Sequence, residues 1–336
     1  MKRVTIKDIA NHLHLSVSTI SRALADDKNI KRETKEQVFE AAKELGYHRN
    51  LLAASLRRGR SNTVGVIVNE MLTPFASEVI KGIQNVMHEK GIRVLICNSN
   101  NNPEQELRNI RLMENSLTDG IIIAMCHDSH NLDEFRRLQE KGIPMVFFNS
   151  TPRGFEVSGV VMNSYSKSFF LVDHLVCSGR RKIVLVRGPQ ATVDMVDIYK
   201  AYLDSLAKFN IPVNKDLIVD ADLSVEEGER IADLLVEKEV DFDAVFASHE
   251  LLAIGIMNRL RDHGITIPDD VSIAGFSGST FSKLVYPKLT TVEPPLEEMG
   301  VKAAEMLLEK LDHPGAAPKK IVIDAKIELR ESSHGK

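Results

Sequence analysis

Short hydroxyl side chains and one arginine gather in the segment 16–22, near the start of the chain. They are Ser16, Ser18, Thr19, Ser21 and Arg22. Short hydroxyls hydrogen-bond phosphate oxygens and base edges, and an arginine can bind guanine through two parallel N–H groups. Contact with a thymine methyl group would explain an outward-facing Val17. The pattern favours contact with double-stranded DNA, and the simpler interpretation is a generic three-helix bundle with a serine-rich helix.

The segment that carries these residues, 1–46, is predicted to be all-helical. Thr5-x-x-Asp8 resembles a capping box, Ser16 can cap a second helix, and Gly46 can end a third. The expected helices cover about 6–13, 17–24 and 32–45. Two short helices joined by a turn of three or four residues predict a helix-turn-helix, whose second helix enters the major groove.

The net charge of −4 is distributed unevenly along the chain. Residues 1–60 contain 13 Lys and Arg against 7 Asp and Glu, a net charge of +6, and the remainder carries −10. A basic head on an acidic body indicates a polyanionic partner at one end, although a charged solvated face would look the same. Residues 47–62 form a basic linker whose LLAASL run is too short to be a stable helix alone.

From residue 63 onward, short apolar runs alternate with helical stretches. Such runs are typical of parallel strands covered on both faces, and repeated strand–helix units predict doubly wound α/β sheets. About ten strands are too many for one such sheet, so we divide the core, 63–336, into two lobes. The first covers about 63–162 plus 293–320 and the second about 163–292 plus 321–330, with 320–329 as one strand. Ligands bind at the carboxyl ends of such strands, which would face a cleft between the lobes.

Composition excludes several other classes. No apolar run approaches the length of a membrane span, and the charged start, MKRVTIKDIANHL, is unlike a secretory signal. The three cysteines, Cys97, Cys126 and Cys177, lack a CxxC spacing, so we expect reduced thiols in a cytosol.

Signatures of catalysis are weak. The chain has no GxxxxGK[ST], and no GxGxxG follows its first strand. Gly275-Phe276-Ser277-Gly278-Ser279 lacks the final glycine of a nucleophile elbow, and His127-x-x-His130 is better interpreted as a surface loop than as a metal site. We therefore expect no enzyme activity, no cofactor and no metal. A sugar-binding transport protein and a two-lobed enzyme are the alternatives to a DNA-binding regulator.

Long stretches of the sequence resemble one known family. VTIKDIANHLHLSVSTISRAL, ETKEQVFEAAKELGY, NLLAASL, DVSIAGF, LTTVEPP and the MGVKAAEMLLE helix are similar to the LacI/GalR family of bacterial transcription regulators. The resemblance covers essentially the whole chain. It implies a repressor that binds a near-palindromic operator as a homodimer, with a periplasmic-binding-protein-like core and a small-molecule pocket between its lobes. It also implies a hinge helix in 47–62 that forms on DNA, with Asn50, Ala53 and Leu56 at the minor groove. We further expect DNA contacts from Thr5, Thr34 and Tyr47.

Several residues depart from the family pattern. In the head, His14 replaces a turn glycine, Lys31 replaces a helix-capping Ser or Thr, and Arg49 replaces a proline. In the pocket, neutral or apolar residues stand where relatives carry Asp, Arg or Asn. The expected effector contacts are Thr73, Phe75, Asn149, Asn163, Gln190, Ile198, Ser248 and Ser277. A sugar or sugar derivative is the expected ligand, and control by a protein coregulator is the alternative.

Overall fold

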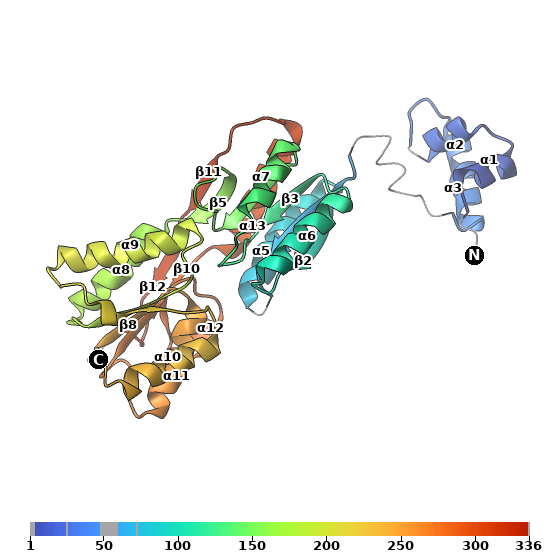
Figure 1. Cartoon of the computed structure of the whole chain (residues 1–336). Coiled ribbons are helices and arrows are strands. Elements are labelled where there is room, and N and C mark those ends of the chain that lie inside the picture. Colours follow the sequence, from blue (N-terminus) through green and yellow to red (C-terminus); the bar gives the residue numbers. More distant parts are fainter. Residues whose placement is uncertain (1–3, 25, 48–59, 72, 335–336) are drawn as a thin grey trace. The chain divides into compact units, whose positions relative to one another are not determined.

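The computed structural model describes residues 4–24, 26–47, 60–71 and 73–334. The chain divides into two compact units, Met1–Ser61 and Asn62–Lys336. They correspond to a small helical head and a larger α/β core (Figure 1). In the described part of the chain, no helix is long and apolar enough to cross a bilayer.

The head contains the three predicted helices. They are α1 (Ile6–Leu13), α2 (Val17–Ala23) and α3 (Arg32–Glu44). The capping box is confirmed, because the Asp8 carboxylate accepts hydrogen bonds from the Thr5 N–H and hydroxyl, at 2.7 Å each. His14 takes the left-handed conformation (φ 53°) that favours glycine, and Lys31 makes no side-chain cap. Ile9, Ile20 and Val38 are fully buried where the helices meet.

The first lobe of the core is a six-stranded parallel sheet in the order β11-β5-β4-β3-β1-β2. Its strands are β1 (Thr63–Val68), β2 (Arg93–Asn98), β3 (Gly120–Ile123), β4 (Met145–Asn149), β5 (Ser158–Met162) and β11 (Lys320–Ile323). Its helices are α5 (Pro74–Glu89), α6 (Pro103–Asn115), α7 (Leu132–Glu140) and α13 (Leu296–Asp312). Helices α5 and α13 touch backbone to backbone at Gly82 and Gly300. A Cβ built on Gly82 would lie 2.2 Å from the Glu297 carbonyl oxygen, so only glycine permits this approach.

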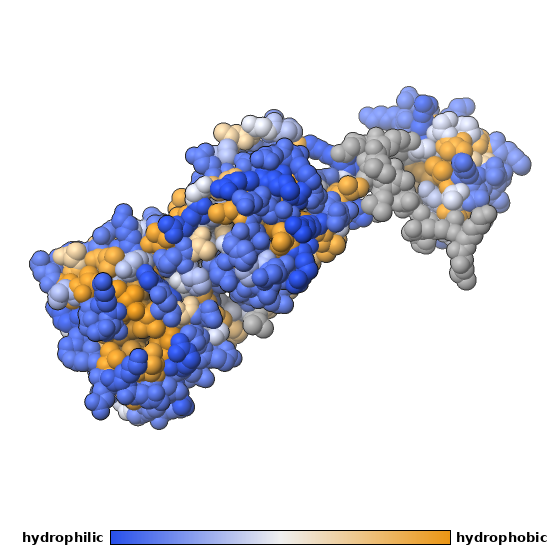
Figure 2. Space-filling view, viewed as in Figure 1, coloured by the Kyte–Doolittle hydropathy of each residue, from blue (hydrophilic) through white to orange (hydrophobic). Residues whose placement is uncertain are grey.

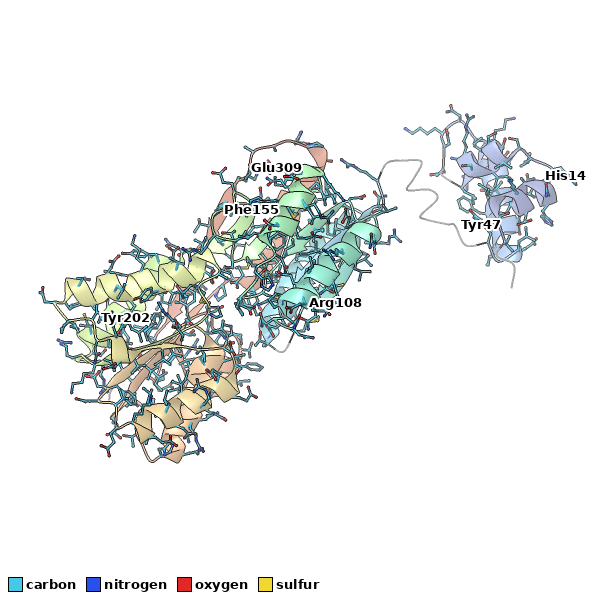
Figure 3. The ribbon with its side chains drawn as sticks, in the orientation of Figure 1. His14, Tyr47, Arg108, Phe155, Tyr202 and Glu309 are labelled. Carbon is cyan, nitrogen blue, oxygen red and sulfur yellow. The ribbon has the colours of Figure 1, made fainter. Side chains whose placement is uncertain are left out.

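The second lobe is a six-stranded sheet in the order β12-β10-β9-β8-β6-β7. Its strands are β6 (Ile183–Arg187), β7 (Ile218–Asp220), β8 (Ala244–Ala247), β9 (Ser272–Gly275), β10 (Thr290–Glu293) and β12 (Lys326–Glu328). Its helices are α8 (Ser164–Cys177), α9 (Val193–Lys208), the 3-10 turn η1 (Lys215–Leu217), α10 (Val225–Glu237), α11 (Glu250–Asp262) and α12 (Phe281–Leu284). Tyr202 of α9 is buried against the sheet, and its hydroxyl donates to the Ile183 carbonyl at 2.9 Å (Figure 3).

The C-terminal segment corrects two details of the sequence prediction. The expected single strand over 320–329 is two strands, and β11 completes the first sheet beside β5. The third crossing between lobes therefore lies at Asp324–Ala325 rather than before 321. Beyond it, β12 pairs antiparallel with β10, so the second sheet is mixed rather than wholly parallel. The run forms two strands because its first half pairs in the first sheet and its second half pairs in the second.

Candidate functional site

Helix α2 presents the predicted DNA contacts on its outer side. Ser16, Val17, Ser18 and Arg22 are exposed, whereas Ile20 and Ala23 are fully buried. The Ser16 hydroxyl accepts the Thr19 N–H at 3.1 Å, which starts the helix as expected. Val17 keeps 43% of its surface exposed, an apolar side chain that the head itself does not cover. The helix is thus anchored by one face and free to enter a groove with the other.

The other expected DNA contacts of the head differ in how exposed they are. Thr5 is exposed, and Thr19, Ser21 and Thr34 are partly exposed. Tyr47 packs its ring against the head core while its N–H donates to the Ala42 carbonyl at 2.8 Å (Figure 3). The hinge residues Asn50, Ala53 and Leu56 lie outside the described residues.

In the core, two histidines that follow strands of different lobes lie against each other. His127 follows β3 and His249 follows β8, and their ring centroids are 6.2 Å apart in an edge-on arrangement. His127 Nε2 lies 3.3 Å from the Asn69 amide nitrogen, and this amide also donates to Asn101 Oδ1 at 3.3 Å. The run 127–130 is a turn with Asp128 and His130 exposed, as expected of a surface loop, but the His127 ring lies against His249 of the other lobe.

Both imidazoles are neutral at physiological pH. Burial lowers the pKa of His127 to about 4, and burial together with the neighbouring His127 lowers the pKa of His249 to about 3. His249 Nδ1 accepts the Leu251 N–H at 3.3 Å, which requires an unprotonated nitrogen. In the part of the chain that the structure describes, no group of three or more His, Cys, Asp or Glu is placed to hold a metal.

A pocket of about 310 Å³ lies at the carboxyl ends of β4 and β5, against the start of α9. This volume falls at the small end of ligand pockets. Its polar lining residues are Asn149, Ser150, Thr151, Asn163, Ser164, Asp194, Asp197 and Lys320. The Ser150 hydroxyl of the first lobe donates to Asp194 Oδ1 of the second. The pocket is therefore built from both lobes, and it includes the predicted Asn149 and Asn163.

The predicted Asn149 and Ser277 share an uncommon backbone conformation. Their φ angles are 66° and 62°, in the left-handed region, and each stands at or just after the end of a strand. Non-glycine residues in this region are under strain, and such positions cluster at binding sites. Asn149 lines the pocket, whereas the described lining does not include Ser277.

Other predicted effector contacts serve the chain itself. The Thr73 hydroxyl caps α5 by accepting the Phe75 N–H at 3.4 Å and donates to Glu70 at 2.5 Å. The Ser248 hydroxyl accepts the Gly188 N–H at 3.0 Å.

The side chains of Gln190 and Ile198 also contact other residues of the core. The Gln190 side chain donates to the Gly188 carbonyl at 3.0 Å. Ile198 is fully buried in the hydrophobic core and does not line the pocket. An apolar residue at this position packs against the interior and offers a ligand no polar group.

Sequence reasoning missed the two carboxyl groups of the pocket, Asp194 and Asp197. Burial raises the pKa of each. Both stand in the first two turns of α9, where acidic residues are common at any helix start. Their position in the chain was the available signal. They come soon after the carboxyl end of β6, and ligands bind at the carboxyl ends of such strands.

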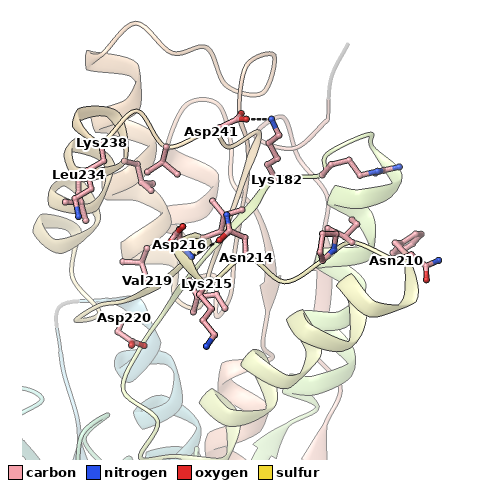
Figure 4. A pocket seen from close by; sticks show the side chains of 18 residues that line it. Lys182, Asn210, Asn214, Lys215, Asp216, Val219, Asp220, Leu234, Lys238 and Asp241 are labelled. Atoms are coloured by element: carbon pink, nitrogen blue, oxygen red, sulfur yellow. Dashed lines mark hydrogen bonds and ion pairs between the residues drawn. The ribbon is translucent and has the colours of Figure 1, made fainter.

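A larger groove of about 1040 Å³ lies elsewhere, along the outer edge strand β7 of the second sheet (Figure 4). It runs between α10 and the segment 209–217, and a Lys182–Asp241 ion pair stands beside it. None of its lining residues comes from the first lobe. A ligand there would not touch both lobes, so the smaller pocket is the better candidate for a site that senses their arrangement.

Comparisons with known proteins agree with this architecture. The family model of bacterial regulatory proteins of the lacI family matches residues 5–50, and that of periplasmic binding protein-like domains matches residues 172–333. The chain belongs to the LacI family. It is a transcriptional repressor with a DNA-binding head and a ligand-binding core, and the family comprises regulators rather than enzymes.

Individual relatives of this LacI-family protein match along nearly their whole length. The ribose operon repressor of Halalkalibacterium halodurans is 26% identical over 331 residues, which covers 98% of this chain and 97% of the relative. The structure of the regulator CelR with cellobiose is 25% identical with a TM-score of 0.74, covering 98% of this chain and 100% of that one. The lac repressor dimer, bound to operator and the anti-inducer ONPF, has a TM-score of 0.85 at 20% identity, with 99% and 100% coverage. The last likeness concerns the fold alone.

Proposed function

We propose that the protein represses transcription by binding a near-palindromic operator as a homodimer, under the control of a sugar or sugar derivative held between the lobes. The observation that carries DNA binding is the exposed face of α2, with Val17, Ser18 and Arg22 outward and Ile20 buried. The lac repressor relative is a dimer on its operator. The site of action would be the DNA in the bacterial cytoplasm.

Exposed apolar side chains on both lobes support the dimer. Leu95 and Ile96 are 42% and 36% exposed on the edge strand β2, and Leu112 on the adjacent α6 is 52% exposed. In the second lobe, Leu284 and Tyr286 are 74% and 78% exposed. Figure 2 shows apolar residues reaching the surface of the core. An uncovered edge strand with apolar side chains favours pairing with a second copy, and two such patches suit a twofold interface.

Control by a ligand follows from how the lobes are joined. The chain crosses between them near 163, 294 and 324, so the lobes can rotate about three adjacent connections. A ligand that touches both lobes binds one arrangement more tightly and shifts the population toward it. We propose that this shift changes the spacing of the first lobes in the dimer and so stabilises or melts the hinge segment at 47–62. Leu56 would then lose or gain its place in the minor groove.

Selection of binding sites from random double-stranded DNA by the full-length protein tests this function. We expect an enriched sequence with two inverted half-sites, and a sugar from a panel that changes its affinity. Enrichment of an asymmetric single site would contradict the dimer. If the enriched site is symmetric but no sugar changes the affinity for it, control by a protein coregulator is favoured over control by a sugar.

A further inference from the structure

The pocket between the lobes contains a buried hydroxyl that has no hydrogen-bond partner among the described residues. Ser164, the first residue of α8, lines the pocket and is only 2% exposed. Its Oγ has no hydrogen-bond partner within the described part of the chain. Buried polar atoms are almost always hydrogen-bonded, so an unpartnered one on a pocket wall indicates a polar group supplied from outside. A ligand with hydroxyl or amine groups would supply it.

Negative charge predominates in the same pocket. Asp194 and Asp197 line it, and Lys320 is the single cation among its described lining residues. The Lys320 ammonium donates to Thr151 Oγ1 at 3.2 Å and lies near enough to Asp197 to lower its pKa. Burial nevertheless raises the pKa of both aspartates, because the pocket solvates negative charge poorly.

The cations nearest the strand ends of the second lobe are already paired. The Arg187 guanidinium is 2.6 Å from Asp220 and lies over the Tyr199 ring, 4.1 Å from its centroid. Arg330 and Lys283 both pair with Glu293. Among the described lining residues of the pocket itself, a phosphate or carboxylate on a ligand would find one cation, Lys320, which already faces Asp197. The described lining of the pocket includes no arginine that could clamp such groups.

We propose that this pocket selects an uncharged polyol or an amino sugar and rejects phosphorylated and acidic sugars. The inference rests on the proposed function and narrows the class of its ligand. Asp194 is the specificity-determining residue: it accepts a hydrogen bond from Ser150 across the lobes and from a donor on the ligand. A ligand anion placed beside it would be repelled in a poorly solvated site.

The test is titration calorimetry on the full-length protein at neutral pH. The neutral and amine probes are glucose, ribose, cellobiose and glucosamine, and the anionic counterparts are glucuronate, glucose 6-phosphate and ribose 5-phosphate. We expect at least one neutral or amino sugar to bind, and its anionic counterpart to bind at least about tenfold more weakly. Asp194→Asn should weaken the neutral sugar about tenfold and narrow the gap to the anion. Asp216→Asn, an aspartate in the groove beside β7, is the matched control and should change neither affinity.

The outcomes separate the two proposals. An anionic sugar that binds as tightly as its neutral counterpart overturns this inference and leaves ligand control standing. A panel in which nothing binds, while the protein still selects a symmetric operator, overturns ligand control and this inference with it. Should Asp194→Asn fail to fold, Ser164→Ala takes its place, since loss of the unsatisfied hydroxyl should weaken the neutral sugar without lowering the unfolding temperature.

Discussion

The recognition helix and the interlobe pocket use the same kinds of side chain in opposite surroundings. On α2, Ser18 and Arg22 are exposed to water, whereas Ile20 and Ala23 are buried. In the pocket, Ser164 is buried and Asp194 has its pKa raised by burial. Exposed groups keep their hydration until DNA arrives, so each adds a modest, salt-dependent share of affinity. Buried groups have lost their water already, so each missing partner there is costly. Substitutions should therefore affect folding in the core and recognition in the head.

The largest expected effect comes from the buried Glu106 that holds the loop carrying His127. Its carboxylate accepts the Cys126 N–H at 2.6 Å, the Ser129 hydroxyl at 2.5 Å and the Asn131 amide at 2.7 Å. Glu106→Ala would leave these buried donors unsatisfied and should lower the free energy of unfolding by about 3 kcal/mol in urea titration. The exposed neighbour Glu104→Ala should change it by less than about 0.5 kcal/mol. Equal losses in the two variants would remove the contrast between buried and exposed carboxylates.

The counterpart in the head is Arg22→Ala. It should leave the unfolding temperature unchanged and reduce discrimination at one base of each half-site by roughly 1–3 kcal/mol. The measurement is affinity for operators substituted at single positions, compared with random DNA. A loss of equal size on random DNA would instead make Arg22 a phosphate contact.

A pH dependence distinguishes the core from the head as well. Because the pKa values of His127 and His249 are lowered from 6.5 to about 4 and about 3, the unfolded chain takes up these protons first. The free energy of unfolding is therefore unaffected by these two histidines above pH 6.5 and falls as the pH decreases toward 4. We expect a loss of at least about 1 kcal/mol over this window. In thermal unfolding, the double variant His127→Gln/His249→Gln should show a flatter acid limb than the parent protein.

The smallest expected effect is a gain. Lys31 stands at the start of α3 without a side-chain cap, so Lys31→Ser should stabilise the head by about 0.5–1 kcal/mol. Hydrogen exchange of the α3 amides measures it, and Lys28→Ser in the preceding loop is the control. Protection that rises equally in both variants would show that lost positive charge, and not capping, is responsible.

The head was predictable because its signals are local. Thr5 with Asp8, and Ser16 with Thr19, lie within one turn of each other, so the sequence itself places the partners together. The core pocket is assembled from three separate segments of the chain, 149–164, 193–197 and 320–322. No sequence feature near His127 predicts its contact with His249. The polar run CHDSHN has the composition of a surface loop. Asp194 was missed for the same reason. An acidic residue is common in the first turn of a helix, and only the folded structure brings this one next to the end of β4.

The family comparison of individual positions had a limit of its own. It identified Asn149, which ends β4 and lines the pocket. Asn163, expected as a substitute contact, follows β5 and lines the pocket too. The comparison also selected Ile198, whose side chain is in the core. Correspondence of position predicts where a backbone lies, whereas the direction and partners of a replaced side chain depend on packing around it. The split between β11 and β12 was missed because the run 320–329 has no glycine or proline to mark the break.

The place of β11 in the first sheet has a consequence for protein synthesis. The head is finished when residue 47 leaves the ribosome, since its three helices contact one another locally. The first lobe waits for α13 and for residues 320–323, which are made after every other strand of that sheet. Domains generally fold as they emerge, so a nascent or prematurely terminated chain presents a DNA-binding surface with no completed sensor behind it. Coupling between ligand and DNA thus begins only after residue 323 has been made.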